Sequence, residues 1–190
     1  MNIYKFLTKF LNGVMSVFVL FKAYGKENIP NDGAFLLCSN HRSFKDPIFI
    51  AASCKRQLTF MAKEELFKVP VIGWLIKKFG AFPIRRGKGD AGAVMATLKI
   101  LRRGDATLIF PEGTRLSDGE RPQINSGIVR LAIQSDVPIV PALCTKNKTY
   151  YGKPIYYGEY VDSVKDAEKM QSLADSLMGT IYSLDKDETI

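Results

Sequence analysis

Residues 40–47 read Asn40-His41-Arg42-Ser43-Phe44-Lys45-Asp46-Pro47, and His41 is the only histidine among 190 residues. Asp46 follows it by five positions, which on a regular helix would place the two side chains roughly 140° apart. They can therefore meet only if the chain turns between them. A short apolar run at 34–39 precedes this stretch, and Pro47 suits the first turn of a helix. The sequence thus predicts a strand, a turn that carries His41, and a helix that begins at Asp46.

Two roles for this stretch are open at this point. An imidazole with a pKa near neutrality is the commonest general base, and a carboxylate can fix its tautomer and stabilise its charged form. Asp46 before Pro47 is equally suited to cap a helix, which would occupy its oxygens with backbone N–H groups. A single histidine can also be an ordinary surface or core residue. The octapeptide alone therefore allows either catalysis or a structural role.

Composition indicates one globular domain, because 46% of the residues are apolar and 24% are charged. Residues 1–100 carry 16 basic and 6 acidic side chains, whereas residues 101–190 carry 11 and 13. The basic half suggests a polyanionic partner: nucleic acid, an anionic membrane surface or a phosphorylated substrate. Nucleic acid is disfavoured, since basic and aromatic residues do not interleave on a strand pair. The scattered cysteines lack metal-binding spacing, which predicts a reducing compartment without structural zinc.

The first 24 residues form a segment of their own in the sequence. Apolar residues recur at helical spacing over 2–23, with Lys5 and Lys9 among them, and the lysine-free run of 10–21 is shorter than the roughly 20 residues needed to span a bilayer. We expect a membrane-association helix over 1–24, lying in the interface, followed by a catalytic domain over 25–190. A core helix and a signal peptide are the alternative interpretations.

Strands and helices alternate along the rest of the chain. This order predicts an α/β fold: one domain with a largely parallel or mixed sheet flanked by helices. Further strands are expected over 57–62, 80–84, 106–110 and 137–143, with 154–161 extended; helices are expected over 47–54, 63–66, 70–78, 90–103, 127–134 and 163–183. Two prolines in 137–143 indicate an edge strand. The glycine-rich nucleotide loops and the G-x-S-x-G elbow are absent from the sequence.

A second motif follows the strand at 106–110 and reads Pro111-Glu112-Gly113-Thr114-Arg115. Ligand sites in α/β folds lie at the carboxyl ends of strands, where this loop and the His41 turn are both expected. Gly113 allows close backbone approach, and Arg115 offers a planar fork of donors suited to phosphate. Lys63 and the pair Arg85-Arg86 also follow predicted strands and could complete an anion site. Alternatively, Arg115 forms a surface ion pair.

The chain resembles the glycerolipid acyltransferases in four blocks that occur in the family's order. The His41–Asp46 stretch is similar to the family's H-x-x-x-x-D motif, and the stretch around Glu112 to its third block. The second and fourth blocks are similar to Gly80-Ala81-Phe82-Pro83-Ile84-Arg85 and Val137-Pro138-Ile139-Val140-Pro141-Ala142. The residues of these blocks and the length of the chain are most similar to those of the bacterial 1-acylglycerol-3-phosphate acyltransferases. One departure is Asn125-Ser126, where many relatives have a lysine before the glycine that opens the next helix.

The resemblance implies transfer of an acyl chain from acyl-CoA or acyl carrier protein to the sn-2 hydroxyl of lysophosphatidic acid. His41 would be the general base and Asp46 would orient it. Arg115, Lys63 and Arg85, in that order, would bind the phosphate, and the loop of Glu112, Gly113 and Thr114 would line the acceptor site. No metal or prosthetic group is implied. The enzyme would act at the cytoplasmic face of the cell membrane, as a peripheral or monotopic protein without a nucleic-acid partner.

Three other functions are compatible with the same residues. Within the family, glycerol-3-phosphate or another lysophospholipid could be the acceptor. A thioester hydrolase would use His41 to activate water instead of an alcohol. A non-catalytic basic membrane-binding protein would not need His41.

Overall fold

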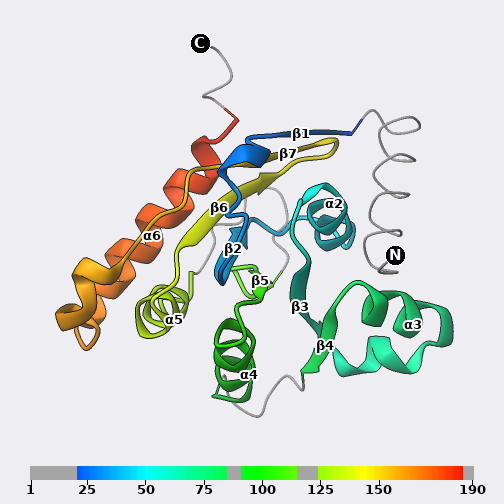
Figure 1. The fold of residues 1–190 in the computed structure, drawn as a ribbon, viewed down its shortest axis with the longest axis horizontal. Coiled ribbons are helices and arrows are strands. Elements are labelled where there is room, and N and C mark those ends of the chain that lie inside the picture. The colour runs from blue at the N-terminus through cyan, green and yellow to red at the C-terminus, as the bar shows by residue number, and fades with distance from the viewer. Residues whose placement is uncertain (1–20, 85–90, 115–123, 186–190) are drawn as a thin grey trace.

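A computed structural model describes residues 21–84, 91–114 and 124–185 of the chain. Within them, seven strands form one sheet in the order β1-β7-β6-β2-β5-β3-β4, and all neighbours run parallel except β6 and β7 (Figure 1). The strands are β1 Lys22–Tyr24, β2 Phe35–Ser39, β3 Leu58–Lys63, β4 Ala81–Ile84, β5 Ala106–Ile109, β6 Ile139–Cys144 and β7 Lys148–Tyr151. The predicted α/β class with a largely parallel, mixed sheet is confirmed.

Helices cover both faces of this sheet. The α-helices are α2 Asp46–Ser53, α3 Pro70–Lys78, α4 Ala91–Leu101, α5 Gly127–Ser135 and α6 Ala167–Ser183, with 3-10 turns η1 Lys26–Asn28, η2 Glu64–Lys68 and η3 Gly158–Ser163. Alternate residues of β2 belong to different halves of the core. Leu36 packs with α5 and α6, whereas Leu37 packs with α2. Buried on both sides, β2 is apolar at four of its five positions, as expected for a central parallel strand.

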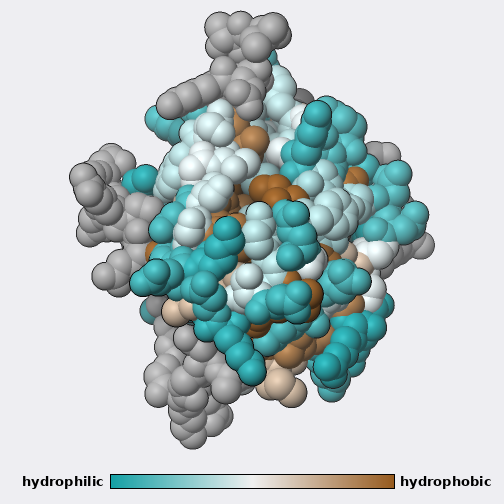
Figure 2. Space-filling view, turned by 90° about the vertical axis from the view of Figure 1, so that its left-hand side faces the viewer, coloured by the Kyte–Doolittle hydropathy of each residue, from teal (hydrophilic) through white to brown (hydrophobic). Residues whose placement is uncertain are grey.

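The helix α6 shows why the C-terminal segment folds as it does. Its inward positions, Met170, Ala174, Leu177 and Ile181, recur at helical spacing and are fully buried. Asp166 accepts a hydrogen bond from the Lys169 backbone N–H at 3.0 Å, which begins the helix. Figure 2 shows the side of the molecule that carries α6, where hydrophilic residues cover most of the surface and hydrophobic residues are visible between them.

The strand predicted over 137–143 was assigned to the wrong position in the sheet. The prolines of 137–143 indicated an edge strand, but β6 lies between β7 and β2. Pro141 is tolerated because it lies just beyond the regular β6–β7 pairing, whose last pair is Ala142 with Tyr151. Its carbonyl accepts from the Gly152 backbone N–H at 2.8 Å, and the next backbone pair, Ile139 with Ile155, is shifted by one extra residue. The missing N–H therefore falls at a bulge, where it breaks no ladder hydrogen bond.

Other boundaries also differ from the prediction. Lys22–Tyr24, expected at the end of a helix, is instead strand β1, which pairs in parallel with β7. Phe21 is buried, and its ring lies 4.8 Å from that of Phe49 on α2, so this segment joins the domain. The segment 154–161 is not extended throughout, because η3 begins at Gly158. Helix α6 begins at Ala167 rather than 163, and strand β7 was not predicted.

The remaining predicted elements agree with the structure to within a few residues. Residues 1–20 of the expected membrane helix lie outside the described residues. In the part of the chain that the structure describes, no helix is long and apolar enough to cross a bilayer.

Candidate active site

The candidate site lies at the carboxyl ends of two neighbouring strands. β2 pairs with β5 in parallel, with Cys38 beside Ile109, so the loops that follow the two strands leave the same edge of the sheet. The first loop carries His41 and the second carries Glu112. The predicted meeting of the two motifs is thus a consequence of strand order.

His41 and Asp46 are in contact, as predicted for a chain that turns between them. The Nδ1 of His41 lies 3.1 Å from the Oδ2 of Asp46, and the two side chains are 18% and 6% exposed. The chain turns between them at residues 42–45, before α2 begins at Asp46. A carboxylate only accepts hydrogen bonds, so this contact places the imidazole hydrogen on Nδ1. The Nε2 lone pair is then left available to accept a proton.

The Asp46 carboxylate serves the turn as well as the imidazole. Its Oδ2 also accepts from the backbone N–H groups of Arg42 and Ser43, each at 2.7 Å. Asp46 is the first residue of α2, where the positive end of the helix dipole stabilises a negative charge. The capping role that the sequence also allowed is not observed: Lys45 occupies the position before α2, its side chain makes no capping hydrogen bond, and Asp46 Oδ2 instead holds the turn and the histidine together.

A ring contact fixes the plane of the imidazole. Phe110, directly after β5, stacks on His41 with ring centroids 4.0 Å apart and planes inclined by 19°. The orientation of His41 is therefore set by two independent contacts, one polar and one apolar.

Glu112 joins the second motif to the first. The carboxylate is buried, with Oε2 accepting from the His41 backbone N–H at 2.9 Å and Oε1 accepting from the Tyr182 hydroxyl at 2.6 Å. These contacts show that Glu112 holds the His41 loop, and its expected place at the acceptor site stays a prediction. Gly113 has a φ of 65°, which glycine adopts without strain, and Gly113 and Thr114 are exposed beyond it.

Tyr182, on the last turns of α6, is a site residue that sequence reasoning missed. Besides donating to Glu112, its hydroxyl accepts from Arg42 Nη2 at 3.4 Å. Partial burial, the hydrogen bond to Glu112 and the charge of that carboxylate raise the pKa of Tyr182 above its usual 10, so the hydroxyl stays a donor. No motif signals it, because 70 residues separate Tyr182 from Glu112.

Asn40 is a second residue whose role was not anticipated. Its side-chain amide donates to the Cys144 carbonyl at 2.9 Å and accepts from the Cys144 backbone N–H at 2.7 Å. It is 3% exposed and extends the pairing of β2 with β6 by one side chain. The residue before the histidine is thereby anchored to a third strand.

The predicted phosphate-binding cations are only partly described. Lys63 is exposed at the carboxyl end of β3, one strand beyond β5 in the sheet. Arg115 and Arg85 lie outside the described residues. Their predicted roles stay predictions. Among described residues, no group of histidine, cysteine and acidic side chains is arranged to hold a metal ion.

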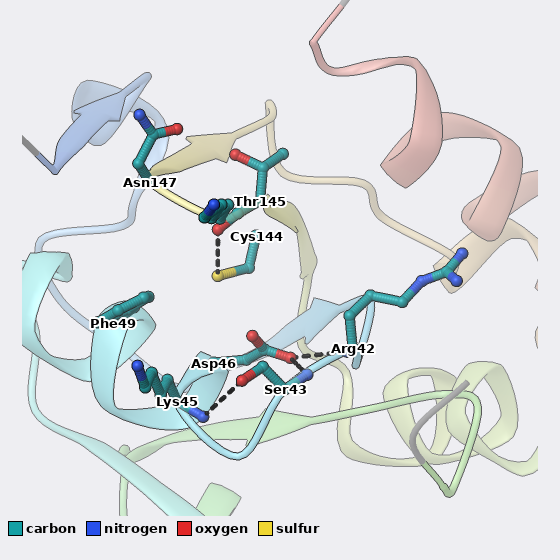
Figure 3. A pocket seen from close by; sticks show the side chains of 9 residues that line it. Arg42, Ser43, Lys45, Asp46, Phe49, Cys144, Thr145 and Asn147 are labelled. Carbon is teal, nitrogen blue, oxygen red and sulfur yellow. Dashed lines mark hydrogen bonds between the residues drawn. The ribbon is translucent and has the colours of Figure 1, made fainter. Parts of the chain in front are cut away.

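A pocket of about 650 Å³ opens beside Asp46, between the start of α2 and the turn that joins β6 to β7 (Figure 3). It is lined by Arg42, Ser43, Lys45, Asp46, Phe49, Cys144, Thr145, Lys146 and Asn147. The pocket lies on the Asp46 side of the pair and does not include the imidazole. Burial raises the pKa of the Cys144 thiol to about 12, so this cysteine is neutral and inert as a nucleophile at neutral pH.

The structure thus defines an α/β domain in which a strand-to-helix turn pairs a histidine with an aspartate. A family model described as Acyltransferase matches residues 20–145, which include both motifs. This match covers more than half of the chain, so the chain belongs to the acyltransferase family. The resemblance found in the sequence is confirmed.

Individual relatives agree with this assignment. The 1-acyl-sn-glycerol-3-phosphate acyltransferase of Bacillus subtilis is 29% identical over 195 residues, covering 96% of each chain. The like-named protein of Streptococcus pneumoniae is 31% identical over 178 residues, covering 86% of this chain and 66% of its own. The crystal structure of the 1-acyl-sn-glycerophosphate acyltransferase of Thermotoga maritima has a TM-score of 0.70 at 22% identity, covering 98% of this chain and 82% of that one, and shows the same fold.

Proposed function

We propose that this protein transfers an acyl chain from a thioester to the sn-2 hydroxyl of 1-acylglycerol-3-phosphate, forming phosphatidic acid. The observation that supports this proposal most directly is the contact between His41 Nδ1 and Asp46 Oδ2, which leaves Nε2 as a positioned base. The names of the Bacillus and Streptococcus relatives support the choice of acceptor.

The chemistry follows from what the pair can do. An alcohol is a poor nucleophile, so His41 Nε2 takes its proton as the oxygen attacks the thioester carbonyl carbon. The C–O bond forms and a tetrahedral oxyanion develops; its collapse breaks the C–S bond. The imidazolium then returns the proton to the departing sulfur, and Asp46 stabilises the charged ring in between. A positioned base of this kind contributes about 10²–10⁴-fold to the rate.

We place the acceptor's phosphate on the Glu112 side of His41, where it needs cations to neutralise its charge. The sheet order places the carboxyl ends of β5, β3 and β4 side by side along the site edge. Lys63 ends β3, and Arg85 and Arg115 follow β4 and the β5 loop in the sequence. We propose that these three residues bind the phosphate of the acceptor, and that the Thr114 hydroxyl donates an additional hydrogen bond to it.

The acyl donor and the cellular location of the enzyme are also part of this proposal. The thioester of coenzyme A and that of acyl carrier protein present the same carbonyl, so the proposed mechanism accepts either. Lysophosphatidic acid resides in membranes, and the excess of basic residues in the first 100 positions favours an anionic surface. We place the enzyme at the cytoplasmic face of the cell membrane, held peripherally or monotopically by residues 1–20, since Phe21 and strand β1 pack into the domain. The proposed steps use no metal or prosthetic group.

Acyl transfer from a labelled thioester to lysophosphatidate in detergent micelles tests this function. Wild type should form labelled phosphatidate, and His41→Ala should lose it by about 10²–10⁴-fold. Gln134→Ala, an exposed position on α5, is the matched control and should keep full activity. Release of free fatty acid without dependence on the lysolipid would instead identify a hydrolase. Preference for glycerol-3-phosphate or another lysolipid would correct the acceptor, and equal transfer by wild type and His41→Ala would refute the role of His41.

A further inference from the structure

The connection between β3 and β4 forms a projection at one end of the sheet. It consists of η2 and α3, and Figure 1 shows α3 beyond β3 and β4, away from α5 and α6. β3 and β4 are parallel, so η2 and the beginning of α3 start at the carboxyl edge, and α3 returns to the opposite edge. That carboxyl edge is the one from which the His41 loop leaves β2, two strands away in the sheet order.

This projection exposes apolar side chains close together. Val69 is 43% exposed, Val71 76% and Trp74 53%. Val71 and Trp74 are three positions apart on α3 and therefore lie on one side of it. Isolated exposed apolar residues are common, but three within six positions form a surface that water solvates poorly, and such surfaces mark interaction sites.

Basic residues flank these apolar ones. Lys68 precedes the exposed valine and Lys77 lies in the last turn of α3; both are exposed. The sequence of α3, Pro70–Lys78, contains no acidic residue. Aliphatic residues and a tryptophan between lysines are the composition of a helix at a lipid–water interface: the indole sits at the headgroup level and lysines meet anionic headgroups.

The projection is also held firmly in place. Gly73 is buried on the inner side of α3, where an added Cβ would lie 2.4 Å from the Phe67 backbone carbonyl of η2. The two segments therefore pack backbone to backbone. Both segments also contact β4, which ties the projection to the edge of the sheet.

We propose that the exposed face formed by Lys68, Val69, Val71, Trp74 and Lys77, here called the docking face, binds an anionic phospholipid surface. It acts in addition to residues 1–20 and turns the carboxyl edge of the sheet, with His41, toward the lipid. The proposal rests on the proposed function in one respect: an acceptor that resides in the membrane gives this orientation its use.

The chain carries its own probe for this proposal, because Trp74 is its only tryptophan. Vesicles containing phosphatidylglycerol, added to the whole protein, should shift the tryptophan emission to shorter wavelength. Lipids brominated in the upper acyl chain should quench it. Protein that sediments with the vesicles while its emission stays unchanged and unquenched would overturn the proposal, because the docking face would then be in water.

Variants separate the docking face from other sources of membrane binding. Val71→Ser keeps the probe and should weaken vesicle binding roughly fivefold, since it removes one apolar contact with the lipid. Lys77→Glu should weaken binding to anionic vesicles and leave the residual binding to neutral phosphatidylcholine vesicles unchanged. Met95→Ser, at a 63% exposed apolar position on α4, is the matched control and should bind like wild type. Equal weakening by Met95→Ser would refute a specific face.

Two further measurements distinguish other outcomes. An emission shift that grows with protein concentration without vesicles would show self-association through this face and would overturn the lipid assignment. Transfer to a short-chain, monomeric lysophosphatidate should be the same in Val71→Ser and wild type. If the acyl-transfer proposal itself were wrong, no transfer would be seen in either protein, whereas the tryptophan signal would still report whether the docking face meets lipid.

Discussion

Tyr182→Phe tests whether the C-terminal helix positions the catalytic loop. The change removes one oxygen and keeps the ring, so Glu112 Oε1 loses its donor at 2.6 Å while Oε2 keeps the His41 backbone N–H at 2.9 Å. Arg42 loses its 3.4 Å contact with the same hydroxyl but retains the ring face, 5.9 Å from its guanidinium carbon to the ring centroid. The perturbation therefore acts mainly on the buried carboxylate.

The magnitude follows from the chemistry of that hydrogen bond. A bond to a charged group contributes about 1.5–3 kcal/mol, and the half-buried position of Tyr182 favours the lower end. A loss of about 1.5 kcal/mol corresponds to a decrease in Tm of roughly 3–6 °C for a domain of this size. If all of it were lost from the transition state, kcat would fall about tenfold.

The assay measures acyl transfer well below the Tm of both proteins, together with thermal unfolding. We expect a lower kcat with little change in KM for the lysolipid, because the loop that carries His41 is loosened while the acceptor contacts remain. Tyr156→Phe is the matched control: this tyrosine is 69% exposed, and removal of its hydroxyl should change neither kcat nor Tm.

A double-mutant cycle separates positioning from general destabilisation. If Tyr182 acts through Glu112, then Tyr182→Phe should have little further effect on kcat in a Glu112→Ala background, which has no side-chain group to hydrogen-bond the tyrosine. Additive effects of the two substitutions on kcat, or a drop in Tm with unchanged kcat, would refute the reasoning and leave Tyr182 as an ordinary stabilising contact.

Three further predictions concern the loop and the core. Asp46→Asn should lower kcat by 10²-fold or more, because its amide oxygen can still accept the three hydrogen bonds made to Oδ2 but carries no negative charge to stabilise the imidazolium, and circular dichroism should show the fold retained. Asn40→Ala should lower the free energy of unfolding by about 1–3 kcal/mol in urea titrations, since both Cys144 backbone groups lose their partner. Burial raises the pKa of the Cys54 thiol from 9.0 to about 11, so above pH 9 the native state holds more protons than the unfolded state. The free energy of unfolding should therefore fall with rising pH between 9 and 11, by up to about 1.4 kcal/mol per unit for this thiol, and less steeply in Cys54→Ala.

The sequence predicted those parts of the fold that depend on local patterns. The run 34–39 reads as a buried strand because both of its faces are apolar, and Pro70–Lys78 was predicted with the bounds that the structure has. Lys22–Tyr24 could not be assigned as a strand, because its stability comes from backbone pairing with β7, which is remote in sequence. The proline rule misplaced β6 for a similar reason: the bulge that accommodates Pro141 belongs to another segment.

The same distinction applies to the site. His41 and Asp46 were predicted to meet because a short turn joins them, and the structure shows this contact. Glu112 was identified from its motif, but its loop-holding contacts depend on strand order. Tyr182 and the partner of Asn40 come from segments whose sequences carry no sign of the contact, so only the tertiary structure reveals them.

These contacts explain how a base on an exposed turn can be positioned as accurately as catalysis requires. The loop from Asn40 to Asp46 is tied to β6 through Asn40, to the β5 loop through Glu112 and Phe110, and to α2 through Asp46. Nε2, where the proton must move, takes no part in these contacts. These contacts involve a strand, a loop and a helix, so loosening any one of them should displace His41 without unfolding the domain. Activity should therefore be more sensitive than stability to substitutions around this loop.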